Sequence, residues 1–339
     1  MKKIFNKLYK LKTLNELESY KLFKKIIKKR ISNISLTAVL TAIKVRSASI
    51  NEIIGAIKAF QKYAKKFPHP NYFFSDIVGT GGDYSNTINI STASAILAAS
   101  LGLKIIKHCN CGISSQLGSI DILKKNNINV NLNLKKNKKQ LDNLNICFLY
   151  APKYHSGFKN VVKVRKELST RTIFNTLGPL LNPSRPNFTV IGVYHQNLLL
   201  PFAKIVHALN YERAIILHSD GMDEITLHGT TNIVEVNRGN ITAYTLYPED
   251  FGLCRISKDK FKNNTIQENC HYFKNISKGI GKIKYQYLIA MNTAILLKVF
   301  GYENLIVNTK IAFQKIQNGD ISKHIKKISM REKICNKIY

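Results

Sequence analysis

The chain has 339 residues, 45% of them hydrophobic, so it can bury the core of one large or two modest domains and is not a disordered chain. Lysine and arginine number 52 against 20 acidic residues, a formal net charge of +32. Only nine of these 52 residues are arginine and the lysines are scattered, so we predict a solvated basic surface rather than a nucleic-acid-binding protein.

The first part of the chain, to about residue 68, is predicted to be helical. Thr13 and Glu16 have the spacing of a capping box before a periodic apolar stretch, and Ser49 and Glu52 repeat this spacing before a second one. A proline-rich linker follows. We therefore expect an all-helical domain at residues 1–70, too short to bury its own faces and packed on a second subunit.

Beyond the linker, short apolar runs alternate with helical patterns. This alternation predicts an α/β domain at residues 71–339, with a mainly parallel central sheet covered on both faces. We expect residues 135–139 to form a surface turn and residues 285–300 an amphipathic helix. The predicted strands cover residues 73–78, 104–106, 145–151, 187–194, 213–218, 231–236 and 241–246, the last two as a hairpin, and further predicted helices cover residues 91–101 and 198–209.

A glycine-rich turn follows the first predicted strand. Residues 79–83 read GTGGD, and residues 89–92 (NIST) open a helix. Glycines let the backbone approach phosphate oxygens, and a helix N-terminus offers free N–H groups. The pattern matches neither a dinucleotide fingerprint nor a P-loop. It predicts a phosphate or pyrophosphate site at this strand end, with an ordinary tight turn as the alternative.

Two further segments follow strand ends, where α/β folds place their ligands. Residues 107–119 begin with Lys107 and are rich in hydroxyl groups, which favours an anion, although a plain Ser/Gly loop is the alternative. Asp223 and Glu224 follow the strand predicted at 213–218, and two adjacent carboxylates favour Mg²⁺. The alternative for this pair is an exposed acidic turn.

The segment 163–183 holds two of the few arginines. Arg165 lies among apolar residues and could receive a carboxylate bidentately. No Ser-His-Asp or Cys-His arrangement is recognisable in the chain.

The cysteines and the apolar runs bear on the compartment. Of the six cysteines only Cys109 and Cys111 are close together, which is a weak zinc pattern, so we predict free thiols in a reducing cytoplasm. The apolar runs are shorter than the about 20 residues that span a bilayer, and the basic N-terminus lacks the apolar core of a signal peptide. We therefore expect a cytoplasmic protein with no membrane segment.

Together, the motifs GTGGD and NIST, the KH-x-N loop, RKELSTRTIFNTLGPLLNP and DGMDE resemble those of the anthranilate phosphoribosyltransferases, in order and over nearly the whole chain. The resemblance implies transfer of a phosphoribosyl group from 5-phosphoribosyl 1-diphosphate to anthranilate, a step of tryptophan biosynthesis. It implies two Mg²⁺ ions per subunit, and a homodimer formed by residues 1–70 joined in space by part of 160–185. It also implies separate anthranilate synthase chains upstream in the pathway.

The resemblance also assigns roles to residues. The implied metal ligands are Ser91, Asp223 and Glu224. The implied anthranilate contacts are Gly79, Asn110, Arg165 and His155. The implied contacts of the phosphoribosyl diphosphate are Gly79, Gly82, Asp83, Thr87, Asn89, Ile90, Ser91, Thr92, Lys107, His108, Cys109, Asn110, Cys111, Gly112, Ile113, Ser114, Ser115 and Ser119.

Five positions depart from the pattern of this family. Cys109 and Cys111 replace a glycine and an arginine of the loop, and Ser219 replaces the glycine before the acidic motif. Ser156 and Gly157 replace a proline and an alanine after His155. We expect an active enzyme with weaker affinity for the phosphoribosyl diphosphate. The rival interpretations are a relative that uses another aromatic acceptor, a pyrimidine nucleoside phosphorylase and a basic nucleic-acid-binding protein.

Overall fold

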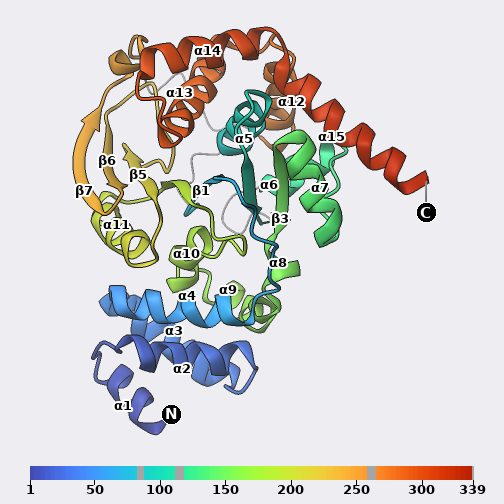
Figure 1. Cartoon of the computed structure of the whole chain (residues 1–339). Helices are drawn as coiled ribbons and strands as arrows, with labels where there is room; N and C mark the ends of the chain where they lie inside the picture. Colours follow the sequence, from blue (N-terminus) through green and yellow to red (C-terminus); the bar gives the residue numbers. More distant parts are fainter. Residues whose placement is uncertain (82–87, 111–117, 258–264, 338–339) are drawn as a thin grey trace.

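Four helices form the N-terminal part of the computed structural model, which describes residues 1–81, 88–110, 118–257 and 265–337. They are the blue helices at the bottom of Figure 1. Their apolar faces share one core with the segment that follows residue 160 and with one face of the sheet. The four are α1 (Lys2–Tyr9), α2 (Glu16–Ile27), α3 (Asn33–Arg46) and α4 (Ile50–Tyr63).

One of the two predicted capping boxes is present in the structure and the other is not. Ser49 caps α4 and Glu52 completes the box, as predicted. The box at Thr13 is wrong, because α2 begins two residues later, where Asn15 and Glu18 cap each other. The backbone N–H of Leu14 donates instead to Glu52 Oε1 at 2.9 Å, which keeps residue 14 outside the helix.

Glu52 connects three parts of the bundle from a fully buried position. Its carboxylate pairs with both terminal nitrogens of Arg46 and accepts the backbone N–H groups of Leu14 and Ser49. Burial acts to raise the pKa of Glu52, but these hydrogen bonds outweigh it and hold the pKa below its ordinary value. The charged form therefore stabilises the bundle.

We expect Glu52→Gln to lower the free energy of unfolding by about 3 kcal/mol at pH 7, because it leaves Arg46 buried without its counter-charge. A carboxylate whose pKa is lower in the folded state stabilises the fold above its ordinary pKa. The deficit of the variant should therefore shrink as the pH falls through the folded pKa of Glu52. Urea unfolding at pH 7 and at lower pH measures both effects.

Glu16→Gln is the matched control, because the ion pair of Glu16 with Lys58 is exposed. It should cost less than about 1 kcal/mol at either pH. Equal losses in the two variants would contradict the role given to Glu52.

A seven-stranded sheet forms the centre of the α/β part, in the order β3-β2-β1-β4-β5-β6-β7. The first five strands are parallel, and β6 and β7 form the predicted antiparallel hairpin. The mainly parallel α/β sheet is thereby confirmed. The strands are β1 (Ser75–Gly79), β2 (Ile105–Cys109), β3 (Ile146–Tyr150), β4 (Phe188–Gly192), β5 (Arg213–Ser219), β6 (Thr231–Asn237) and β7 (Asn240–Leu246).

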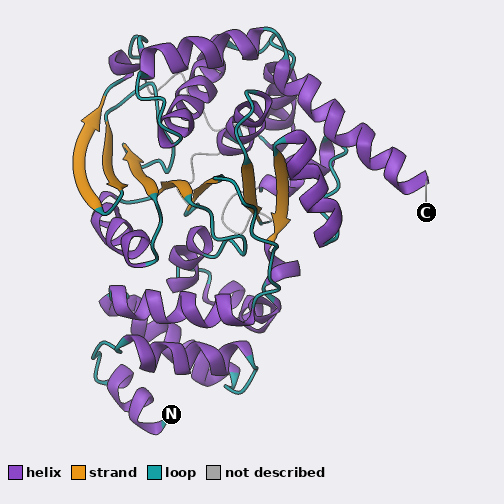
Figure 2. Ribbon diagram, in the orientation of Figure 1, coloured by secondary structure: helices purple, strands orange, loops and turns teal. Residues whose placement is uncertain are grey.

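Helices cover both faces of this sheet, as Figure 2 shows. Ile77, Val190 and Ile215 pack on one face against α5 (Ile90–Ser100) and α13 (Ile283–Val299). Ile191 and Ile216 pack on the other, toward α11 (Leu199–Ala208) and the N-terminal bundle. No helix among the described residues is long and apolar enough to cross a membrane. The other helices are α6 (Ser119–Lys125), α7 (Leu134–Leu144), α8 (Ala151–Tyr154), α9 (Lys159–Leu168), α10 (Ile173–Leu177), α11 (Leu199–Ala208), α12 (Ile266–Ser277), α14 (Leu305–Gln317) and α15 (Asp320–Lys337).

Two further local predictions are wrong. The lysine-rich segment at 135–139 belongs to α7, because Asn133 caps the helix and Leu141 and Leu144 anchor its apolar face. The helix predicted at 285–300 is present as α13, but its side chains are buried on nearly all sides. It lies between the sheet and α14 and has no solvent face of the kind that an amphipathic helix presents.

Candidate active site

The carboxyl ends of the parallel strands bring the glycine turn and the acidic motif together. Gly79 and Gly192 are the last residues of β1 and β4 and face each other in register. The backbone N–H of Gly81 donates to Asp223 Oδ2 at 2.6 Å. A Cβ atom on Gly192 would lie 1.5 Å from the carbonyl oxygen of Asp223, and one on Gly79 would lie 2.3 Å from Asp223 Oδ2. Asp223 therefore requires both glycines.

The second acidic residue contacts the start of α5. The backbone N–H of Ser91 donates to Glu224 Oε1 at 3.2 Å. The buried ammonium of Lys107 donates to the carbonyl oxygen of Ile77 at 2.6 Å and to Ser91 Oγ at 3.3 Å. The structure thus gathers one hydroxyl, two carboxylates and one ammonium at the ends of β1, β2 and β5.

The donor set suits a hard divalent cation. Ser91, Asp223 and Glu224 offer oxygen atoms only, and Mg²⁺ binds through one or two carboxylates while keeping positions for water and phosphate oxygens. These three residues therefore fit the cation that the sequence predicts. Within the described residues no group of three or more His, Cys, Asp or Glu side chains is placed to hold a metal ion.

His218 joins the turn before the acidic pair to the neighbouring strand. One ring nitrogen, Nδ1, is 2.7 Å from the carbonyl oxygen of Val193, and Nε2 accepts the backbone N–H of Gly221 at 3.2 Å. The hydroxyl of the buried Ser219 lies 2.7 Å from Thr231 Oγ1. Ser219, which stands where the family pattern has glycine, therefore has a hydrogen-bond partner in Thr231 of β6.

β2 extends beyond its predicted end at residue 106. Lys107, His108 and Cys109 are consequently strand residues, whereas the sequence predicts them in a loop. Cys109 faces the core, where burial raises the pKa of its thiol to about 12, so the thiol stays protonated. Burial also lowers the pKa of His108 to about 3, and a neutral imidazole offers no cation to a phosphate.

A buried carboxyl group fixes the backbone of this strand. Asp76 Oδ2 accepts the backbone N–H of His108 at 3.3 Å and the side-chain amide of Asn182 at 2.8 Å. Burial raises the pKa of Asp76 to about 6, against the opposing effect of Lys107. Asn182 also donates to the carbonyl oxygen of Ile106 at 2.8 Å. Asn182 therefore ties the segment after α10 to β1 and β2.

An aromatic cluster joins the N-terminal bundle to this end of the sheet. It consists of Phe60, His155, Phe158 and Phe174, whose rings meet in mostly edge-to-face pairs with centroids 4.8–6.2 Å apart. The guanidinium of the half-buried Arg165 lies 5.4 Å from the ring centroid of Phe174. Burial lowers the pKa of Arg165 to about 10, so it remains a cation at neutral pH.

His155 lies inside the aromatic cluster as a neutral group. Burial lowers its pKa to about 4, and Nε2 is 2.7 Å from the carbonyl oxygen of Leu181, so this nitrogen carries the proton. Its Nδ1 has no hydrogen-bond partner in the described residues. His155 can therefore contribute a ring surface and one acceptor, but no charge.

The remaining predicted residues fall into three groups. Ile90 and Thr92 are buried in the core, so only their backbone faces the strand ends. Asn89 precedes α5, Asn110 directly follows β2, and Ser119 is the first residue of α6. The predicted residues that lie outside the described part of the chain are Gly82, Asp83, Thr87, Cys111, Gly112, Ile113, Ser114 and Ser115.

Comparison with known proteins decides the family. Two family models match, the glycosyl transferase family a/b domain over residues 71–321 and the helical bundle domain of the same family over residues 2–64. The anthranilate phosphoribosyltransferase of Buchnera aphidicola subsp. Schizaphis graminum is 55% identical over 329 residues, 97% of this chain and 98% of the relative. The chain belongs to the anthranilate phosphoribosyltransferase family. It is an enzyme of the pentosyltransferase class, in a family whose reaction serves tryptophan biosynthesis.

Solved anthranilate phosphoribosyltransferases share the whole fold. The enzyme of Thermus thermophilus is 28% identical with a TM-score of 0.88, and the match covers 96% of this chain and 98% of that one. The enzyme of Saccharomyces cerevisiae was solved in complex with 5-phosphoribosyl 1-diphosphate (PRPP) and Mg. It is 27% identical with a TM-score of 0.85, and the match covers 97% of this chain and 98% of that one. Another structure of the yeast enzyme contains 4-fluoroanthranilate.

The sequence does not predict three residues that the structure places at the site, namely Gly192, His218 and Asp76. Gly192 and His218 lie at the end of buried strands and carry a weak signal, since a glycine and a histidine interrupt apolar runs there. Asp76 carries a stronger one, because an acid inside an apolar strand is costly unless it is paired. The partners of all three lie far away in the sequence, and these distant partners reveal what the residues do.

Proposed function

We propose that the chain transfers the 5-phosphoribosyl group of 5-phosphoribosyl 1-diphosphate to the amine of anthranilate, releasing pyrophosphate. The meeting of Ser91, Asp223 and Glu224 at the strand ends supports this proposal most directly. In the reaction the ribose C1–O bond breaks, the amine nitrogen bonds to C1 and gives up one proton to water, and pyrophosphate leaves with the electron pair of the broken bond. The protein supplies positioning and electrostatics, and no covalent nucleophile is required.

The phosphoribosyl diphosphate would bind at the glycine turn and the start of α5. The positive dipole end at the N-terminus of a helix favours phosphate oxygens, and Gly79 lets the backbone approach them. Ser91, Asp223 and Glu224 would hold Mg²⁺, with two ions per subunit. When bound, Mg²⁺ offsets the negative charge of the diphosphate. Lys107, tied to Ser91 and Ile77, adds a fixed positive charge at the same strand end.

Anthranilate would lie against the aromatic cluster. Arg165 would hold its carboxylate and thereby set the direction of the amine. Asn110 and Gly79 would complete the contact from the ends of β2 and β1. The neutral ring of His155 would form part of the wall.

Loss of anthranilate fluorescence in the presence of 5-phosphoribosyl 1-diphosphate and Mg²⁺ tests the activity. The expected result is consumption of anthranilate that stops when Mg²⁺ is chelated. Consumption of another aromatic amine, but not of anthranilate, would favour the alternative acceptor. No consumption of either would contradict the proposal.

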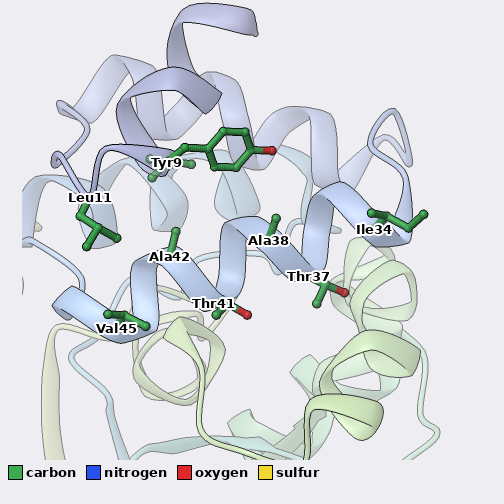
Figure 3. Close-up of a pocket in the computed structure, with 9 residues that line it drawn as sticks. Tyr9, Leu11, Ile34, Thr37, Ala38, Thr41, Ala42 and Val45 are labelled. Carbon is green, nitrogen blue, oxygen red and sulfur yellow. The ribbon is translucent and has the colours of Figure 1, made fainter.

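We also propose that residues 1–70, with part of 160–185, form a homodimer interface. An apolar groove of about 600 Å³ runs between α1 and α3 (Figure 3). Ile34 and Val45 on its wall are 85% and 68% exposed, unusually high for large aliphatic side chains. Side chains of α9 and α10 share the core of this bundle, which ties the interface to the segment that carries Arg165.

Ile34→Glu should weaken the dimer by at least about tenfold, because a charge would be buried in an apolar contact. Sedimentation at several protein concentrations measures the change. Ile280→Glu is the control, since Ile280 is 73% exposed in the turn before α13, away from the groove. A wild-type chain that sediments as a monomer, or an Ile34→Glu variant with unchanged dimerisation, would contradict the interface.

The cytoplasm is the proposed location, with anthranilate supplied by separate anthranilate synthase chains. Cys109, Cys147, Cys254 and Cys270 are free thiols, as a reducing compartment favours. Fractionation of the source cells tests the location, and recovery with membranes or in an oxidising compartment would contradict it.

A further inference from the structure

A buried asparagine of α13 holds the backbone next to the acidic pair. Asn292 Oδ1 accepts the N–H of Ile225 at 3.1 Å, and its Nδ2 donates to the carbonyl oxygen of the same residue at 3.1 Å. A third bond runs from Nδ2 to the carbonyl oxygen of Leu288 at 2.8 Å and fixes the side chain on its own helix. We propose that Asn292 is a positioning residue that sets the geometry of Asp223 and Glu224 for metal binding.

The two bonds to Ile225 constrain more than a single contact would. A side-chain amide that pairs with both polar groups of one residue fixes the orientation of the peptide units on either side of it. Ile225 directly follows Glu224, so the direction of the Glu224 carboxylate depends on this pairing. Ile225 is fully buried and Asn292 is only 3% exposed. Loss of the amide would therefore leave two backbone groups unpaired away from water.

The same helix also supports the opposite side of the metal site. Ser94 of α5 donates its hydroxyl to the carbonyl oxygen of Ile289 on α13 at 3.3 Å. One turn earlier on α5, the N–H of Ser91 donates to Glu224. Figure 1 shows α5 and α13 beside each other next to the sheet. A single helix thus fixes the serine and the two carboxylates relative to one another, as the second shell of a metal site does.

The inference rests on the proposed metal site, and the chain offers a matched control for it. Asn308 of α14 is 4% exposed, and its Nδ2 donates to the carbonyl oxygens of Tyr302 and Ala294 at 2.6 and 3.4 Å. It is therefore an equally buried asparagine bound to backbone, with no contact to the acidic motif. Asn292→Leu and Asn308→Leu keep the number and branching of the side-chain heavy atoms, remove their polar groups and add no charge near the carboxylates. Both add the bulk of two methyl groups, so the two variants carry the same steric change.

Binding of Mn²⁺, a paramagnetic substitute for Mg²⁺, is measured by electron paramagnetic resonance with 5-phosphoribosyl 1-diphosphate present, and the melting temperature is measured alongside. Asn292→Leu should weaken Mn²⁺ binding by at least about tenfold. Asn308→Leu should lower the melting temperature but leave Mn²⁺ affinity within about twofold of the wild type, since it breaks no contact to the site. If the role of Asn292 were purely structural, Asn292→Leu would lower the melting temperature and leave the Mn²⁺ affinity unchanged.

Two results would overturn the inference: an Asn292→Leu protein that binds Mn²⁺ like the wild type, or an Asn308→Leu protein that loses affinity equally. If Asn292→Leu does not fold, the less bulky Asn292→Ala is judged by the same criteria. Asp223→Asn separates this inference from the proposed function. If the wild type binds no Mn²⁺, or Asp223→Asn binds it normally, the metal site itself is wrong. If Asp223→Asn loses Mn²⁺ affinity and Asn292→Leu does not, the metal site is supported and the role proposed for Asn292 is wrong.

Discussion

Gly192→Ala is expected to lower kcat/KM by at least about 100-fold, or about 2.7 kcal/mol of transition-state stabilisation. The added Cβ would lie 1.5 Å from the carbonyl oxygen of Asp223, a distance that no relaxation of a side chain can relieve. The backbone of the acidic motif must therefore move away from the end of β4. The hydrogen bond from the N–H of Gly81 to Asp223 Oδ2 would be lost in the same movement.

Initial rates of anthranilate consumption over a range of Mg²⁺ concentrations measure this effect. We expect the Mg²⁺ requirement to rise, because the defect lies at a proposed metal ligand. Gly102→Ala is the control. Its Cβ would meet nothing within 4 Å, but the residue has φ +97°, so the variant should lose about 1 kcal/mol of stability while keeping its activity. Wild-type activity in Gly192→Ala would contradict the placement of Asp223.

Arg165→Lys is expected to raise the KM for anthranilate by about 10- to 100-fold, the equivalent of one hydrogen bond to a charged group. Lysine keeps the charge but lacks the planar fork that binds a carboxylate at two points and lies over an aromatic ring. The KM for 5-phosphoribosyl 1-diphosphate should change little, since Arg165 lies against Phe174 of the aromatic cluster and not at the glycine turn.

Arg255→Lys is the matched control for this substitution. The guanidinium of Arg255 also lies over an aromatic ring, 5.1 Å from the centroid of Tyr247, and pairs with Glu249 on the surface. Both KM values should stay at the wild-type level in this variant. An equal rise of the two KM values in Arg165→Lys would show that the residue acts on the whole fold and has no specific role in binding anthranilate.

The elements that the sequence predicts well are those whose environment is uniform. The strands predicted at 145–151 and 187–194 are mostly apolar because both faces of a parallel sheet are buried. β2 is predicted too short, because Lys107 and His108 end the apolar run although both side chains are buried. Their burial depends on partners such as Ile77 and Asp76 on the neighbouring strand, which no local pattern records.

The candidate site divides in the same way. The residue types of the motifs and their order along the chain predict a phosphate turn before α5, an acidic pair after β5 and an arginine in α9. Each of these predictions requires only that a certain residue type stands at a strand end or on a helix. Their spatial relation is a different matter. The contact between Asp223 and the two glycines depends on β1 and β4 being neighbours in the sheet, although Gly79 and Gly192 are far apart in the chain.

The sequence by itself therefore determined the family, the α/β class and the kinds of side chain available for chemistry. Only the tertiary structure decided which of them meet, how Asp76 and Asn182 fix β2, and that the side chain of Asn292 pairs with the backbone of Ile225, 67 residues away. The physical reason is that local patterns report which face of an element is buried. The partner of a buried polar group is chosen by the packing of distant segments, where each unpaired donor or acceptor would cost about 1–3 kcal/mol.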